Sequence, residues 1–365
     1  MKRIFTLSLS LLVAGSAFGA AFTSGDLVVF TVGNGSSLAG TAMSGALYEY
    51  DTVTANQASP VQTIAMPNPF VLGGSASAEG FLKLSTDGNY LTMFGYNAAV
   101  GSAAPSGTTG AVDPRVVARI DRAGNINTTT ALTDPTGSAR SAISTDGTSI
   151  WTTTSSSGSR YATLGGTTSV GLIGGNLRVA NIYNGQLYVS TAAAGVLGVA
   201  TIGTGLPTTT SQIMTELPGM PTTGTHSSYD FFFKDANTLY VADDGTAANS
   251  GGIQKWTLSA GTWSLSYTLL NTGTATTGCR GLTGMVDGSG NVELFATTSA
   301  LSTANTLIEV IDTGVNTSTF TTLATAPTGD AFRGVAFLTQ IPEPSSFALA
   351  GLGLLALAIS RRARR

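Results

Sequence analysis

The sequence predicts an all-β fold, on three observations. Charged residues make up only 10% of the chain and hydrophobic residues 42%, which leaves enough apolar surface for a packed core. Short apolar runs recur throughout, and many are separated by Asp-Gly or Asn-Gly. The pattern repeats about every 40 to 60 residues, a period that indicates a repeat architecture. The length of 365 residues therefore suits one large β domain.

The strongest repeated element is a hairpin. Asp-Gly and Asn-Gly favour the tight turns of antiparallel hairpins because both positions tolerate positive φ. Apolar strands flank such a turn at Asp87-Gly88, Asp146-Gly147, Asn184-Gly185 and Asp287-Gly288, and a related turn lies at Asp235-Ala236-Asn237. Each repeat is thus expected to open with a hairpin.

Further strands follow the hairpin in several repeats. The third-strand segments are 47–51, 117–121, 253–257 and 308–312, and fourth strands are expected at 61–65 and 320–324. Four antiparallel strands in each unit, arranged radially, form a β-propeller. The units resemble those of extracellular bacterial propellers, which read roughly S-x-D-G-x-x-L-Y-V followed by V-x-x-I-D, and this resemblance implies the fold far more than a function.

We count six four-stranded blades. Five units begin near residues 79, 138, 176, 228 and 279. Segment 332–338 matches a first strand without its partners, and segment 22–68 is a unit without its first strand. Joining the two would close the ring and remove its exposed edges. Seven blades remain an alternative if the long second unit hides another, and a right-handed β-helix is a second one.

The two ends predict export. Residues 1–20 have the basic start, apolar run and small residues of a signal peptide. The predicted body, residues 21–340, is followed by segment 341–365, in which Ser345 to Ser360 carry no charge and arginines follow. As a helix the uncharged segment would span about 24 Å, somewhat less than a ~30 Å hydrocarbon layer. We expect a single transmembrane helix, with Arg361, Arg362, Arg364 and Arg365 as a cytoplasmic stop signal.

The C-terminal segment resembles the PEP-CTERM sorting signal of Gram-negative bacteria. The order of Pro342-Glu343-Pro344, apolar stretch and terminal arginines carries this resemblance, although Ile341 replaces the usual valine. It implies that an exosortase-type membrane protease recognises Pro342, Glu343 and Pro344. It also implies a protein anchored in the membrane before sorting and placed at the cell surface or outside the cell afterwards. An ordinary single-pass anchor is the alternative.

Charge and residue types exclude several classes of partner. Without the terminal bases and Glu343, the body has 11 basic and 19 acidic residues, a net charge of −8 that repels nucleic-acid phosphates. Cys279 is the only cysteine and His226 the only histidine, so we predict no disulfide, no histidine-rich metal site and no cofactor. The loop from Asp287 to Glu293 loosely resembles a calcium loop, but it lacks the full pattern and is expected to be a hairpin turn.

The body contains one unusual cluster of bases. Four arginines stand just before the first strand of a unit, and they are Arg140, Arg178, Arg280 and Arg333. First strands line the channel of a propeller, so these side chains would converge near one mouth. Guanidinium groups suit the carboxylates or sulfates of an acidic exopolysaccharide. In the alternative, each arginine pairs with an aspartate or carbonyls of the neighbouring blade.

These observations predict a non-enzymatic surface or matrix protein with a binding or structural role. The scarcity of catalytic motifs leads us to expect that the chain is not an enzyme. A secreted polysaccharide-active enzyme, either a glycosidase or a lyase, is the alternative, because propellers host such activities and distant loops can bring carboxylates together.

Overall fold

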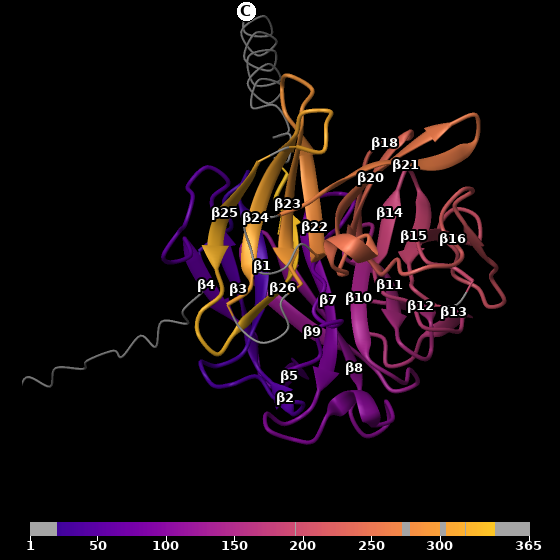
Figure 1. Ribbon diagram of the computed structural model, residues 1–365. Coiled ribbons are helices and arrows are strands. Elements are labelled where there is room, and N and C mark those ends of the chain that lie inside the picture. The colour runs from indigo at the N-terminus through magenta and orange to yellow at the C-terminus, as the bar shows by residue number, and fades with distance from the viewer. Residues whose placement is uncertain (1–19, 194, 272–277, 300–303, 318, 340–365) are drawn as a thin grey trace, which may run out of the picture.

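The structure is a six-bladed propeller (Figure 1). The computed structural model describes residues 20–193, 195–271, 278–299, 304–317 and 319–339. Among them, strands form six antiparallel sheets, which we number as blades 1 to 6 in ring order. The predicted blade number is therefore confirmed, and the seven-bladed and β-helical alternatives are wrong.

Blades 3 to 6 are each built from consecutive strands. Blade 3 contains β10 (Ala139–Ser144), β11 (Ser149–Thr154), β12 (Ser159–Thr163) and β13 (Val170–Ile173). Blade 4 contains β14 (Ala180–Tyr183), β15 (Gln186–Ser190), β16 (Val199–Ile202) and β17 (Met214–Glu216). Blade 5 contains β18 (Ser228–Asp235), β19 (Thr238–Asp243), β20 (Gly252–Ser259) and β21 (Thr262–Leu269), with a short 3₁₀ turn η2 (Ala247–Asn249). Blade 6 contains β22 (Cys279–Val286), β23 (Val292–Thr298), β24 (Thr306–Asp312) and β25 (Phe320–Thr325).

Blade 1 joins the two ends of the body, as the sequence predicts. Its order is β26 (Ala331–Phe337), β1 (Leu27–Val32), β3 (Gly45–Tyr50) and β4 (Gln62–Ala65). The C-terminal strand pairs antiparallel with β1, with Val335 opposite Val29. This pairing closes the ring, because it removes the two free edges that an open array of blades would expose.

Blade 2 is the irregular one. Its core is β6 (Lys83–Leu84), β7 (Tyr90–Asn97), β8 (Arg115–Asp121) and β9 (Ile126–Leu132). The strands β2 (Ala42–Met43) and β5 (Phe70–Gly73) extend it, since β5 pairs with the end of β7. The 3₁₀ turn η1 (Pro105–Gly107) lies in the long β7–β8 connection. The long β7–β8 connection, rather than a seventh blade, accounts for the length of the second unit.

The Asn184-Gly185 turn forms as predicted, whereas in the 287–291 loop the residue with positive φ is Gly290 and not Gly288. Asn184 and Gly185 have φ of 46° and 71°, and the flanking Tyr183 and Gln186 pair directly across β14 and β15. Positive φ at both central residues is the geometry of a two-residue hairpin turn that matches strand twist. Gly147 also has positive φ, at 77°.

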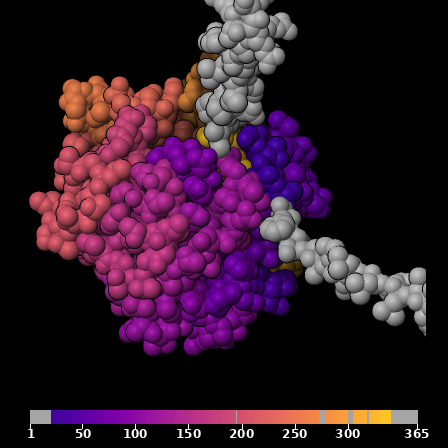
Figure 2. Space-filling view, turned by 180° about the vertical axis from the view of Figure 1, so that it is seen from behind, coloured from indigo at the N-terminus to yellow at the C-terminus, as the bar shows by residue number. Residues whose placement is uncertain are grey.

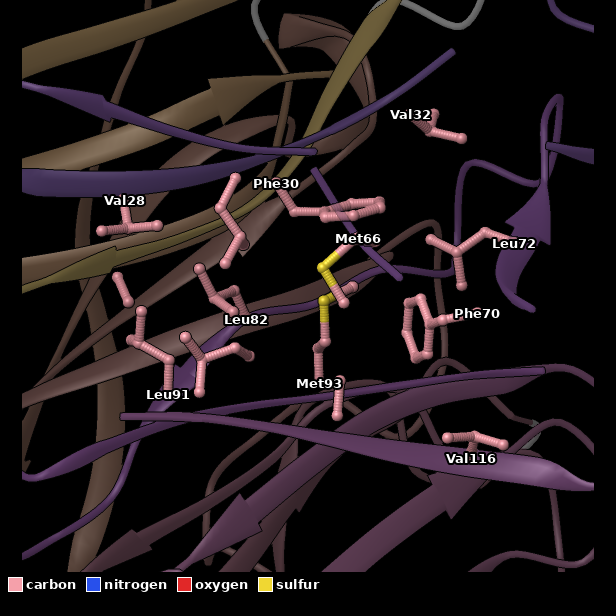
Figure 3. Close-up of a cluster of buried hydrophobic side chains, with 14 of the residues drawn as sticks. Val28, Phe30, Val32, Met66, Phe70, Leu72, Leu82, Leu91, Met93 and Val116 are labelled. Carbon is pink, nitrogen blue, oxygen red and sulfur yellow. The ribbon is translucent and has the colours of Figure 1, made fainter. Parts of the chain in front are cut away.

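Apolar side chains between the blades form the core. Between blades 1 and 2, Phe30 and Val28 of β1 face Leu91 and Met93 of β7, and Met66 fills the space between them (Figure 3). From behind, blades 2 to 4 form one continuous packed surface (Figure 2). Blades therefore gain stability from packing against each other, because large apolar side chains are buried in the layer between them.

The predictions for the two terminal segments cannot be placed in the described structure. The signal peptide, the Ser345–Ser360 segment and the terminal arginines lie outside the described residues. Within the described ranges, no helix has the length and apolar character needed to cross a membrane.

Candidate functional site: the two mouths of the channel

The innermost strands of the six blades run in the same direction around a central channel, so their starts meet at one mouth. Arg140 lies in β10, Arg280 in β22 and Arg333 in β26, all near the strand start, and Arg178 lies two residues before β14. We call this end the arginine mouth.

Contacts between the arginines show how closely they gather. The Cζ atom of Arg178 lies 3.9 Å from the centre of the Tyr229 ring, and that of Arg280 lies 5.3 Å from it. Burial is the main cause that lowers the pKa of Arg140 and of Arg333. The positive charge of Arg178 lowers the pKa of Arg140 further, and the charge of Arg280 does the same for Arg333. Arg178 and Arg280 therefore share one aromatic ring, and Arg140 and Arg333 each lie close enough to one of these two for charge repulsion.

The channel is closed in its middle by side chains from opposite blades. Phe81 of blade 2 contacts Tyr229 of blade 5, with ring centres 5.7 Å apart. On the far side of this contact, Lys83 Nζ lies 2.7 Å from Asp230 Oδ1. Blades 2 and 5 face each other across a ring of six, so these two pairs span the channel. Among the described residues, these two pairs therefore lie between the two mouths of the channel.

Two of the arginines are held by neighbouring groups, as the alternative reading of the sequence expects. Arg280 Nη2 lies 2.7 Å from Asp244 Oδ2 of the adjacent blade and its Nη1 donates to the Ser299 carbonyl. Arg178 donates to Ser227 Oγ at 3.0 Å and to the Ser228 carbonyl at 2.8 Å. These guanidinium groups have protein partners on the channel side.

Arg140 and Arg333 are different. In the described part of the chain, the Nε and Nη1 atoms of Arg140 and the Nε atom of Arg333 are buried and have no hydrogen-bond partner. Arg333 is only 4% exposed and donates one hydrogen bond, from Nη2 to the Gly74 carbonyl. Burial lowers the pKa of Arg140 and lowers that of Arg333 to about 10. A buried donor without an acceptor lowers the stability of the folded protein, so each such donor calls for an explanation.

Arg115 shows that this fold can satisfy a buried arginine. Its side chain is 0% exposed. It donates to the carbonyls of Asp113, Thr108 and Gly137. Arg119 and Arg122 also have one buried nitrogen each without a partner among the described residues, but only Arg140 and Arg333 place such donors at the arginine mouth.

One acidic residue at this mouth was missed by sequence reasoning. Glu79 is 1% exposed and accepts hydrogen bonds from the Tyr96 hydroxyl at 2.6 Å and the Gly73 amide at 3.0 Å. Burial raises its pKa, while Arg333 opposes that shift. A cavity of about 10 Å³ lies between Glu79, Arg280 and Arg333, which is room for one water molecule. No signal in the sequence marks Glu79.

The opposite end of the channel holds a larger cavity that the sequence did not predict. It has a volume of about 270 Å³, and the ends of the innermost strands of five blades line it. Tyr183, Phe232 and Phe337 contribute half-buried aromatic rings, and Lys83 lies at its inner end. We call this end the aromatic mouth. The Phe231-Phe232-Phe233 run is the one sequence feature that could have pointed to it.

The remaining candidate residues from the sequence analysis lie in a turn, in the core or against other side chains. Asp287 accepts hydrogen bonds from the Ser289 and Asn291 amides, so its loop is a hairpin turn. Cys279 is buried, and burial raises its thiol pKa to about 12. The His226 ring lies 3.3 Å from Gln254 Nε2, and burial lowers its pKa. The described residues contain no group of three or more His, Cys, Asp or Glu side chains placed to hold a metal ion.

Comparison with known proteins identifies the C-terminal segment. Residues 340–365 match the PEP-CTERM protein-sorting motif. The chain carries a PEP-CTERM sorting signal. This motif implies an exported protein that an exosortase recognises and sorts to the cell surface. No curated protein matches the chain.

Solved structures with a similar chain path include proteins named as enzymes. A putative 6-phosphogluconolactonase from Bacteroides fragilis is 11% identical with a TM-score of 0.47, and the match covers 82% of both chains. A gluconolactonase from Xanthomonas campestris is 10% identical with a TM-score of 0.45, covering 88% of this chain and 91% of that one. A chain of a nidogen/laminin complex is 14% identical with a TM-score of 0.48, covering 85% and 97%.

These structures correct one prediction. The expectation that the chain is not an enzyme is wrong, because propellers named as lactonases are among its structural neighbours. A scarcity of catalytic motifs therefore does not exclude catalysis on this fold. At 10–14% identity and TM-scores below 0.5, the likeness assigns no activity to this chain.

Proposed function

We propose that this exported propeller binds the carboxylate or sulfate groups of an acidic extracellular polysaccharide at its arginine mouth. The observation that carries the proposal is the set of unpaired donors on Arg140 and Arg333. A guanidinium fork matches a carboxylate or sulfate in geometry and charge. An anionic group entering the mouth would supply the acceptors that the protein itself does not.

The position of the sorting motif supports this proposal. Thr339, the last residue before the matched segment, lines the aromatic mouth. The motif therefore starts at the end of the channel opposite to the arginines. While the chain is held by its C-terminal segment, the arginine mouth would face away from the point of attachment and toward the extracellular polymer.

Binding of the full chain to polygalacturonate tests the proposal, with neutral dextran as the comparison polymer. Arg140→Met should weaken binding by about tenfold, since a charge-assisted hydrogen bond contributes about 1.5–3 kcal/mol. Arg160→Met is the matched control, because Arg160 lies on the outer strand β12 and pairs there with Asp134. Equal binding of dextran and polygalacturonate, or unchanged binding in Arg140→Met, would contradict the proposal.

A further inference from the structure

The aromatic mouth has the form of a second, separate ligand site. Its cavity of about 270 Å³ is lined by β6, β14, β18 and β22 and by the end of the closing strand β26. This volume lies just below the usual range of about 300–1,000 Å³ for ligand pockets. It is therefore suited to a ligand the size of one sugar ring.

The inner end of this cavity presents hydrogen-bond donors without excess charge. Lys83 Nζ donates one hydrogen bond among the described residues, to Asp230. An ammonium group has three protons, so two remain for a ligand. Asp230 is 0% exposed and also accepts from the Phe231 and Leu282 amides. Because the carboxylate balances the ammonium, an anionic ligand gains little here, whereas a hydroxyl group can accept from Lys83.

The walls of the cavity are aromatic and are supported from behind. Tyr183 stacks on Phe233 with ring centres 4.6 Å apart and an interplanar angle of 13°. Phe337 stacks on Phe295 at 6.0 Å and 9°. Phe232 lies against Gly284, where an added Cβ would be 3.0 Å from its Cδ1 atom. Rings that are already packed lose little freedom when a ligand covers their outer faces.

The rim is polar and uncharged. Thr86, Asn181, Thr283 and Thr339 line the cavity between the aromatic rings. The lining thus alternates apolar faces with short hydrogen-bonding groups, which suits a ligand that has one apolar face and several hydroxyl groups.

From these features we infer that the aromatic mouth binds one neutral sugar ring, with its apolar face on the aromatic walls and a hydroxyl group at Lys83. This site is independent of the arginine mouth, because the Phe81–Tyr229 contact and the Lys83–Asp230 pair separate the two. One molecule could therefore hold an anionic group at one end of its channel and a neutral sugar at the other.

The experiment uses the full chain and the methyl glycosides of glucose, galactose and mannose, with binding measured by saturation-transfer NMR and calorimetry. We expect at least one glycoside to bind, and Phe232→Leu to weaken it by about tenfold, equivalent to about 1.4 kcal/mol. Phe232→Leu leaves the Lys83–Asp230 pair intact, so its folding can be verified by an unchanged urea midpoint. Arg160→Met, far from the channel on β12, is the control and should bind like the wild type.

Three results would overturn the inference. The first is that none of the three glycosides binds to the folded wild type. The second is binding that Phe232→Leu leaves unchanged. The third is binding of a methyl glycoside that Arg140→Met abolishes, since that would place the ligand among the arginines. If no glycoside binds at the aromatic mouth, polygalacturonate can still bind at the arginine mouth. The opposite outcome is also possible, so the two proposals are distinguishable.

Discussion

The two mouths of the channel treat buried charge in opposite ways. At the aromatic mouth, the Lys83 ammonium is matched to the Asp230 carboxylate, with Nζ and Oδ1 2.7 Å apart. At the arginine mouth, donors of Arg140 and Arg333 are buried without partners in the described part of the chain. In a matched pair the charge is balanced without a ligand, whereas unmatched donors lower stability until something binds them.

This difference separates a charge that holds the fold from a charge that is available for function. The Lys83–Asp230 pair connects opposite blades and so helps to hold the centre of the ring. Arg140 connects nothing through its side chain among the described residues. Substitutions at the two places should therefore change stability in opposite directions.

The largest effect is expected at the matched pair. Lys83→Met leaves the Asp230 carboxylate buried without its ammonium partner, and breaking a buried pair in this way costs about 3–5 kcal/mol. The measurement is the free energy of unfolding from urea titration. The double variant Lys83→Met/Asp230→Leu removes both charges and should recover most of the loss. A Lys83→Met protein within about 1 kcal/mol of the wild type would show that the pair does not hold the ring.

A smaller effect of opposite sign is expected at the arginine mouth. Arg140→Met removes buried donors that have no partner, so without ligand and at low salt it should stabilise the protein by about 1 kcal/mol. Arg280→Met is the contrasting variant, because Arg280 holds Asp244 and its removal should destabilise. The same urea titrations measure both. If Arg140→Met destabilised as much as Arg280→Met, Arg140 would have a structural role and the comparison would fail.

The fold was predictable because its signals are local. Positive φ at Asn184-Gly185 and the repeated strand pattern each depend on a few neighbouring residues. Closure by β26 and β1 followed from counting incomplete units at the two ends. The β2 and β5 strands were missed because each has few residues and pairs across a long separation, where the sequence gives no turn signal.

The sites were predictable only where a residue type repeats at one position of the blade. Four arginines at the starts of first strands gave the arginine mouth from the sequence. Lys83 and Asp230 are 147 residues apart and meet only because blades 2 and 5 face each other in a closed ring of six. Glu79 has no repeated counterpart. Contacts across a channel depend on blade number and register together, which no local pattern encodes.

The smallest effect concerns protonation near the aromatic mouth. Asp26, whose carbonyl accepts from the Leu338 amide beside that mouth, has its pKa raised to about 6 by burial and by repulsion from Glu49. The unfolded value is 3.8. Between about pH 4 and 6 the folded state therefore holds more protons than the unfolded state, and stability from this group falls as pH rises through that window.

Asp26→Asn has no proton to lose, so it should reduce this fall in stability when unfolding is measured by urea at several values between about pH 4 and pH 7. The change should stay below about 1 kcal/mol, because Asp26 is only half-buried and water screens its repulsion from Glu49. Asp287 provides a control of opposite sign, since hydrogen bonds from Asn291 lower its pKa and its contribution is lost as pH falls. An Asp26→Asn profile that runs parallel to the wild type would show that protonation beside the aromatic mouth is not coupled to folding. The contrast between the two mouths would then rest on the lysine and the arginines alone.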